Sequence, residues 1–195
     1  MRTVQRDLLV LGPLLLLGTL ALTGCTPEPA PQAPQASETT APTDAPVFAS
    51  DEEALAAATE AFAAYDAMTG LIGASGGNEP ERIVPFVTVE YYPSLFAGFQ
   101  KFQESGYFSK GISRFDTISL VDRSEFESEV AQVEVYLCSD VTEIQLLNEA
   151  GQDVTPEHRP NRVPLQVELV SSGSDPSTLL ISKETVWPGQ DFCSR

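Results

Sequence analysis

The sequence predicts an α+β fold in which N-terminal helices pack on an antiparallel sheet. Three observations support this prediction. Apolar residues recur at helical spacing between residues 50 and 105. From about Gly111 onward they alternate with polar residues, and short polar turns separate the alternating segments. Helices followed by strands are typical of α+β domains.

The first helix is expected to begin at Ser50, because Ser50-Asp51-Glu52-Glu53 has the pattern of a capping box. In this motif the serine oxygen accepts from a free backbone N–H of the first turn, and Glu53 reaches back to a donor before the helix. Gly70 is expected to end the helix. Its core-facing residues follow at helical spacing: Leu55, Ala58, Phe62 and Tyr65.

Two shorter helices are expected next. Asn78-Glu79-Pro80-Glu81 opens a short helix, and Pro85 limits its length. The third helix runs from about Pro93 to Ser105, with Gly106 just past its end. Its apolar positions are Leu95, Phe96, Phe99 and Phe102.

The second half of the chain predicts strands. Between residues 133 and 137, and again between 163 and 169, apolar and polar residues alternate, as in strands with one buried face. Further strands are expected at Gly111–Val121, Val141–Leu147 and Thr178–Trp187. Turns are expected at residues 122–124, 148–152 and 172–176.

This order of elements resembles the nuclear transport factor 2-like cone, also called ketosteroid-isomerase-like or cystatin-like. In that family a long N-terminal helix and one or two shorter ones pack into a strongly bent antiparallel sheet. The resemblance covers roughly Ser50 to Trp187 and rests on element order, domain length and the aromatic-rich segment Val87–Tyr107. It implies a cone-like domain with a pocket between the helices and the concave sheet.

Residues 1–24 have the layout of a secretory signal peptide. Arg2 and Arg6 precede Leu8–Leu22, an uncharged run that is too short to span a membrane. The run ends in Leu22-Thr23-Gly24-Cys25, which resembles the lipobox of bacterial lipoproteins. The resemblance implies that Cys25 becomes the mature N-terminus and carries a diacylglyceryl group with acyl chains such as palmitate. The protein would then be anchored, extracytoplasmically, to the outer face of the bacterial cell membrane. The alternative is an ordinary secreted protein in which Cys25 is a spare thiol.

Residues 25–46 are expected to form a tether. After the lipidated cysteine this segment is rich in Pro, Ala and Thr and nearly free of large apolar residues, so it cannot bury a core. A Pro-rich ligand for another protein is the alternative, but no basic anchor flanks its prolines. Residues 47–195 match the size of one domain.

The charge balance excludes some functions. The 195 residues include 11 Lys and Arg against 28 Asp and Glu, a formal net charge of −17. A nucleic-acid binder needs a basic face, and docking on anionic lipid by charge needs basic residues. The chain has three cysteines and one histidine, and we expect no zinc site of the usual four-ligand Cys/His type. We therefore predict no nucleic-acid partner, metal or cofactor.

Cys138 and Cys193 are predicted to form a disulfide. They are the even pair that remains once Cys25 is assigned to the lipid, and an extracytoplasmic location permits the bond. Cys138 ends a predicted strand and Cys193 follows the last one, so the bridge would pin the C-terminal tail to the sheet. One reactive catalytic cysteine is the alternative.

Other motifs favour structural interpretations. Gly73-Ala74-Ser75-Gly76-Gly77 matches Gly-x-Ser-x-Gly, but a helix rather than a strand precedes it, so a flexible loop is expected. It also lacks the Lys-Ser/Thr of a phosphate-binding loop. His158 lies in a polar loop and is expected to be exposed. A further group is expected to be a solvated strand edge rather than a cation site: Asp122, Glu125, Glu127 and Glu129.

Aromatic residues crowd between Tyr91 and Phe108. The cone resemblance implies that some of them line the pocket, and the alternative is that they form ordinary core. Ketosteroid-isomerase-like enzymes place an acid and a tyrosine inside the cone. Either Tyr91 or Tyr92 with either Asp116 or Glu134 would supply such a pair, but the spacing does not choose among them, so no catalytic residue is predicted. The candidate lining residues are Tyr91, Tyr92, Phe96, Phe99 and Trp187.

The sequence favours a lipid-anchored binding or interaction module without a catalytic set. Its partner would be a small apolar ligand or another envelope protein. The alternative is a small-molecule enzyme of the isomerase or dehydratase-like kind that uses a pocket acid and a tyrosine. A homodimer formed through the open face of the sheet is a third hypothesis.

Overall fold

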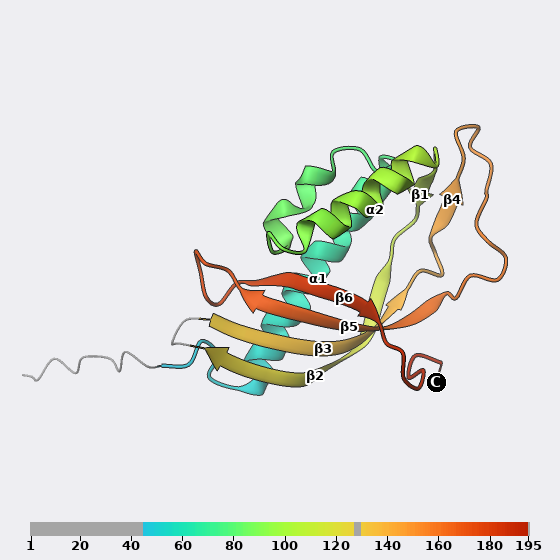
Figure 1. The fold of residues 1–195 in the computed structure, drawn as a ribbon. Helices are drawn as coiled ribbons and strands as arrows, with labels where there is room; N and C mark the ends of the chain where they lie inside the picture. The colour runs from blue at the N-terminus through green and yellow to red at the C-terminus, as the bar shows by residue number, and fades with distance from the viewer. Residues whose placement is uncertain (1–44, 127–129, 195) are drawn as a thin grey trace, which may run out of the picture. The chain divides into compact units, whose positions relative to one another are not determined.

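The computed structural model describes residues 45–126 and 130–194, and these form an α+β fold as predicted (Figure 1). The helices are α1 (Asp51–Ala74), η1 (Pro80–Phe86, a 3-10 helix) and α2 (Tyr92–Glu104). The strands are β1 (Phe108–Lys110), β2 (Arg114–Phe126), β3 (Val130–Asp140), β4 (Gln145–Leu147), β5 (Arg162–Ser171) and β6 (Leu179–Val186).

Several predictions concern residues outside the described ranges. These are the signal peptide, the lipobox with Cys25, the tether as far as Asp44, and the acids Glu127 and Glu129. In the described ranges, no helix combines the length and the apolar character that a membrane span requires.

The strands form two antiparallel sheets rather than the single predicted one. The larger sheet has the order β2-β3-β5-β6, and β1 pairs with β4 in a separate two-stranded sheet. Helix α1 crosses one face of the larger sheet, and η1 and α2 lie on the side of β6 (Figure 1). The segment after η1 is tied to that edge, because the Thr88 N–H donates to the Ile181 carbonyl.

The core lies between α1 and the inner face of the larger sheet. The predicted alternation in β3 and β5 is confirmed, since the inward residues of both strands are buried and the residues between them are not. Each apolar side chain moved from water to such a core contributes about 1.5–3 kcal/mol. The core residues of α1 are Ala54, Ala58, Phe62, Tyr65 and Ile72. The inward residues of the strands are Val133, Val135, Leu137, Leu165, Val167 and Leu169.

Helix α1 begins as predicted but ends later. The Ser50 hydroxyl accepts from the Glu53 N–H at 3.2 Å, and the Glu53 carboxylate accepts from the Ala49 N–H at 2.8 Å. The helix runs through Gly70 because glycine inside a helix costs about 1 kcal/mol and does not by itself break it. Termination comes at Gly76 and Gly77, whose φ values are +74° and +82°. A Cβ on Gly77 would lie 2.6 Å from the Phe99 carbonyl oxygen, so this glycine also lets α2 pack against the turn.

The predicted turn at residues 122–124 is wrong, because β2 continues to Phe126. Arg123 points inward, and its guanidinium donates to the Phe48 carbonyl at 2.7 Å. Glu125, predicted to lie on a solvated edge, accepts from the Val47 N–H at 3.0 Å. The two side chains fix the segment that leads into α1. The strand expected at Val141–Leu147 is shortened to β4, and β1 is an additional strand.

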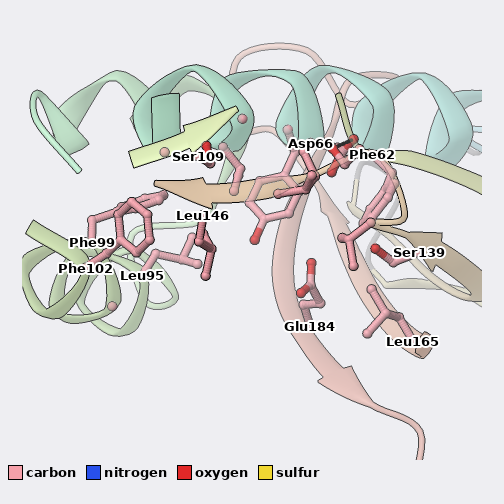
Figure 2. A pocket seen from close by; sticks show the side chains of 18 of the residues that line it. Phe62, Asp66, Leu95, Phe99, Phe102, Ser109, Ser139, Leu146, Leu165 and Glu184 are labelled. Atoms are coloured by element: carbon pink, nitrogen blue, oxygen red, sulfur yellow. Dashed lines mark hydrogen bonds between the residues drawn. The ribbon is translucent and has the colours of Figure 1, made fainter. Parts of the chain in front are cut away.

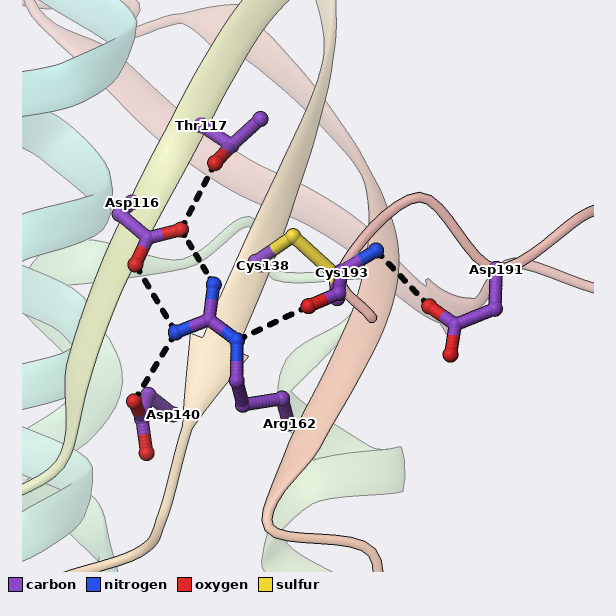
Figure 3. Close-up of a disulfide and its surroundings, with 7 residues drawn as sticks. All are labelled: Asp116, Thr117, Cys138, Asp140, Arg162, Asp191 and Cys193. Atoms are coloured by element: carbon purple, nitrogen blue, oxygen red, sulfur yellow. Dashed lines mark hydrogen bonds and ion pairs between the residues drawn. A yellow bond between two sulfur atoms is a disulfide. The ribbon is translucent and has the colours of Figure 1, made fainter. Parts of the chain in front are cut away.

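The predicted disulfide is confirmed: Cys138 and Cys193 are bonded, with their Cα atoms 5.6 Å apart (Figure 3). Arg162 strengthens this attachment of the C-terminal tail. Its guanidinium donates to the Cys193 carbonyl at 3.1 Å and forms ion pairs with Asp116 at 2.7 Å and Asp140 at 3.0 Å. The tail thus covers part of the outer face of the sheet.

Loss of the disulfide should loosen the tail and destabilise the domain. Replacing both cysteines with serine (Cys138→Ser, Cys193→Ser) should lower the free energy of unfolding by about 2–4 kcal/mol, because the unfolded chain is no longer constrained. Denaturant unfolding followed by far-UV circular dichroism measures this. Trp187, the single tryptophan of the chain, reports on the tail by fluorescence.

Chemically reduced wild-type protein is the matched control and should behave like the double variant. Equal unfolding midpoints for the oxidised protein and the variant would contradict the account.

Candidate functional site

A cavity of about 490 Å³ lies between α1, α2 and the inner side of the strands (Figure 2). Its volume is in the range of small-molecule sites. We call it the α1–α2 cavity. Helix α1 contributes Phe62, Tyr65, Asp66, Thr69, Gly70 and Gly73. Helix α2 contributes Ser94, Leu95, Gly98, Phe99 and Phe102. The remaining walls are Ser109, Ser113, Ser139, Val141, Ile144, Leu146, Leu165 and Glu184.

The cavity exists because α1 is longer than the sheet is wide. Its 24 residues span about 36 Å, whereas four strands at about 4.8 Å spacing span less than 20 Å. The last turns of α1 are therefore covered by other elements, β1 and α2. Contact with β1 is close, since a Cβ on Gly73 would lie 2.7 Å from the Ser109 hydroxyl oxygen.

Two helical glycines keep the cavity open. Gly70 on α1 and Gly98 on α2 both line it, and a Cβ at either position would meet no atom within 4 Å. Neither glycine has a positive φ, so backbone conformation does not require glycine at these positions. Each costs the helix about 1 kcal/mol relative to alanine. Glycine at these two positions therefore leaves empty space at the parts of the cavity wall that α1 and α2 form.

Glu184 and Asp66 bring carboxyl groups into this mainly apolar space. Glu184 projects from β6 toward α1 (Figure 2). Burial raises the pKa of Glu184 to about 6; an interaction with the Tyr65 hydroxyl opposes this shift, and the charge of Asp66 adds to it. Burial also raises the pKa of Asp66, opposed by the Ser113 hydroxyl, which donates to its carboxylate at 2.7 Å.

Two tyrosines, Tyr65 and Tyr91, lie near Glu184. Burial, followed by the negative charge of Glu184, raises the pKa of both Tyr65 and Tyr91. Both phenols therefore stay protonated at neutral pH and can donate hydrogen bonds. The site thus combines an ionisable acid with neutral donors.

A β-bulge turns Glu184 toward the cavity. Leu169 pairs with Ile181 but Glu168 pairs with Lys183, so Ser182 is an extra residue in β6. The Ser182 hydroxyl donates to the Glu168 carbonyl at 3.0 Å, which holds the bulge. With strict alternation Lys183 would share the inner face with Ile181. Because of the bulge Lys183 lies outside with Glu168, and Glu184 lies inside opposite Val167.

Of the predicted lining residues, Phe99 lines the α1–α2 cavity. Tyr92 lines a different groove, beside Val89 and Leu180, and Phe96 packs on Tyr92 with ring centroids 5.7 Å apart. Trp187 packs on Tyr136, 4.7 Å between centroids. Tyr136 alternates with buried Val135 and Leu137, so Trp187 belongs to the outer face. Tyr91 is not a wall residue, although it interacts with Tyr65 behind the wall.

The acids considered from the sequence do not reach the cavity. Asp116 pairs with Arg162, which holds the pKa of this carboxyl below its ordinary value. Glu134 accepts a hydrogen bond from Gln166 on the outer face.

The remaining sequence motifs have structural roles. Ser75 is the C-cap of α1, and its hydroxyl donates to the Ile72 carbonyl at 2.9 Å. His158 is exposed in its loop, as expected. Within residues 45–126 and 130–194, His, Cys, Asp and Glu form no group of three or more that could hold a metal ion.

Comparisons with known proteins identify no family. No family model matches the chain, and no curated protein matches it. One similar solved structure is the intermembrane space region of chloroplast protein ARC6, at 15% identity and TM-score 0.45, covering 66% of this chain and 92% of that one. Another is a periplasmic fragment of TraM, at 12% identity and TM-score 0.45, covering 70% of this chain and 96% of that one. Similarity at this level does not show what the chain binds, and the cone resemblance stays a prediction.

The raised pKa of Glu184 predicts a pH-dependent stability. The folded state binds this proton more tightly than the unfolded chain does, whose pKa is near 4.5. The stability contributed is therefore fully present below that value and is lost as pH rises through about 6. Glu184→Gln should raise the free energy of unfolding by up to about 2 kcal/mol at pH 7.5 and by close to zero at pH 4.

Urea unfolding at the two pH values measures this difference. Glu60→Gln, which removes an exposed carboxyl from α1, controls for the loss of one charge. A Glu184→Gln effect of the same size at both pH values would show that the carboxyl is not buried as described.

Proposed function

We propose that the protein is a lipid-anchored extracytoplasmic module that binds a small, mainly apolar molecule in the α1–α2 cavity. The observation that carries this proposal is the cavity itself, whose walls are mostly apolar with a few polar groups. Binding sites for small molecules commonly have this composition. The disulfide supports an oxidising, extracytoplasmic compartment.

The lipobox sequence supports the anchor. With a net charge of −17 the chain is repelled by anionic lipid headgroups, so charge cannot hold it at a membrane surface. Two acyl chains on Cys25 would hold it stably, where one chain would be marginal. The Pro-rich segment would then place the domain at a distance from the bilayer.

An enzyme is the second candidate function, and Glu184 favours it. A carboxyl with a pKa of about 6 is suited to proton transfer near neutral pH. Tyr65 would donate a hydrogen bond to a substrate oxygen, as the tyrosine does in the ketosteroid-isomerase-like enzymes that the element order of the sequence resembles. Turnover of a carbonyl compound that is lost in Glu184→Gln would favour this function over simple binding.

A cavity-filling variant tests ligand binding. All buried residues in the described ranges lie between Phe48 and Cys193, so the segment 45–195 carries its own core and is expected to fold alone. Native mass spectrometry of this segment, produced in its own host, should show an extra mass that is lost on denaturation. Gly98→Leu should abolish that mass, because Gly98 lines the cavity and a leucine side chain there would occupy open space at its wall. Leucine also favours a helix over glycine, so folding should be retained.

Ala97→Leu, at an exposed neighbouring position of α2 that does not line the cavity, is the matched control and should keep the extra mass. A bare protein mass for the unmodified segment, or an extra mass that persists in Gly98→Leu, would contradict binding in this cavity.

Lipid anchoring is tested separately in cells. Cys25→Ser should move the full-length protein from the membrane fraction to the aqueous fraction or block its processing, because the acceptor sulfur is gone. Fractionation after detergent phase separation measures the change. Wild-type behaviour of the variant would contradict the anchor.

A further inference from the structure

The charges around the α1–α2 cavity are unbalanced. Asp66 enters from α1 and Glu184 enters from β6. Among the described residues that line the cavity, none is Lys, Arg or His. The cation next to Glu184 in sequence, Lys183, lies on the outer face and pairs with Glu168 at 2.8 Å. Both carboxyls therefore border the cavity, and no lining residue supplies a positive charge to pair with them.

We infer that the ligand of the α1–α2 cavity is an amphipathic amine, with an apolar body and one cationic group that pairs with Glu184 and Asp66. This inference rests on the proposed binding function and specifies its ligand class. A protonated amine supplies the donors and the positive charge that the two carboxylates lack. In a partly desolvated site such a pair is stronger than in water.

The walls fit both parts of such a molecule. The apolar body would lie among Leu95, Phe99 and Phe102 of α2, with Leu146 and Leu165 opposite. The amine would lie between α1, which carries Asp66, and β6, which carries Glu184 (Figure 2). Phe62 and Tyr65 border this end, and aromatic rings attract cations.

An unsatisfied hydroxyl at the same end supports a polar head group. The Thr69 hydroxyl oxygen is buried on the cavity wall and lies near Tyr65, but within the described part of the chain no group is placed with hydrogen-bond geometry to it. Buried hydroxyls nearly always have a partner, so a ligand donor or a ligand-bound water is expected there.

Anionic ligands are disfavoured by the same arrangement. A fatty acid would place its carboxylate beside Glu184 and Asp66, and like charges in a desolvated site repel. Protonation of Glu184 at low pH would weaken amine binding. The groups that face Glu184 are Tyr65 and Asp66 of α1, Tyr91 before α2, and Val167 on the neighbouring strand. Of these only Asp66 is a second carboxyl, and it already accepts a hydrogen bond from the Ser113 hydroxyl at 2.7 Å, so it retains only part of the attraction for the amine.

Three probes with the same body test the inference: 4-phenylbutylamine, 4-phenylbutanol and 4-phenylbutyrate. Isothermal titration of the segment 45–195 at pH 7.5 should give a Kd for the amine at least tenfold lower than for the alcohol, with the carboxylate weakest. At pH 5 the affinity for the amine should fall while that for the alcohol stays constant, because only the amine depends on the ionised carboxyl.

Glu184→Gln should reduce the preference for the amine over the alcohol severalfold, because only Asp66 is then left to pair with the amine, and should leave the affinity for the alcohol unchanged. Glu168→Gln removes a carboxyl from the outer face of the same sheet and should keep the preference for the amine. Equal binding of amine and alcohol to the unmodified segment would overturn the inference, and so would a preference that is undiminished in Glu184→Gln. In either case the binding function stands if Gly98→Leu blocks the probes. Binding of none of the three probes, together with a bare native mass, would overturn both.

Discussion

The burial of one long helix against a narrow sheet sets the architecture of this domain. The apolar face of α1, with Phe62 and Tyr65 at its centre, can be covered by the larger sheet only over part of its length. The remaining turns need other cover, which β1 and α2 provide. Because Gly70 and Gly98 leave the facing surfaces unfilled, the junction between these layers is a cavity rather than packed core. The site therefore follows from a mismatch between the length of a helix and the width of a sheet.

The chemistry of the cavity depends on a second local feature, the bulge at Ser182. This one extra residue changes which side chains of β6 point inward, so that a glutamate occupies a position beside buried Val167 and the neighbouring lysine pairs outside. An inward carboxyl that is partly desolvated carries a cost in stability when it is charged. A cationic ligand would offset that cost, which is how the binding proposal and the burial of Glu184 are connected.

Four features could be predicted from the sequence, because each depends on local periodicity, capping or cysteine pairing. They are the fold class, the start of α1, the buried faces of β3 and β5, and the Cys138–Cys193 bridge.

The end of α1 could not be predicted from the sequence, since Gly70 and Gly76 differ only in their backbone conformation. The continuation of β2 was missed because Arg123 is polar in sequence yet binds the backbone of Phe48 inside the domain. Glu184 was missed for a similar reason, because the alternation rule assigns it to solvent unless the bulge is known. Asp66 and Tyr65 were visible only as helix residues, and their relation to β6 is set by tertiary packing.

The C-terminal tail is held to the sheet by the Cys138–Cys193 disulfide and by the Arg162 guanidinium. The central claim is that Glu184 lies inside the cavity. Carbon-detected NMR titration of the Glu184 side-chain carboxyl in the segment 45–195 tests it most directly. The Glu184 carboxyl should titrate with a pKa of about 6. A value near that of an exposed glutamate, about 4.3, would contradict the inward orientation and with it the proposed site.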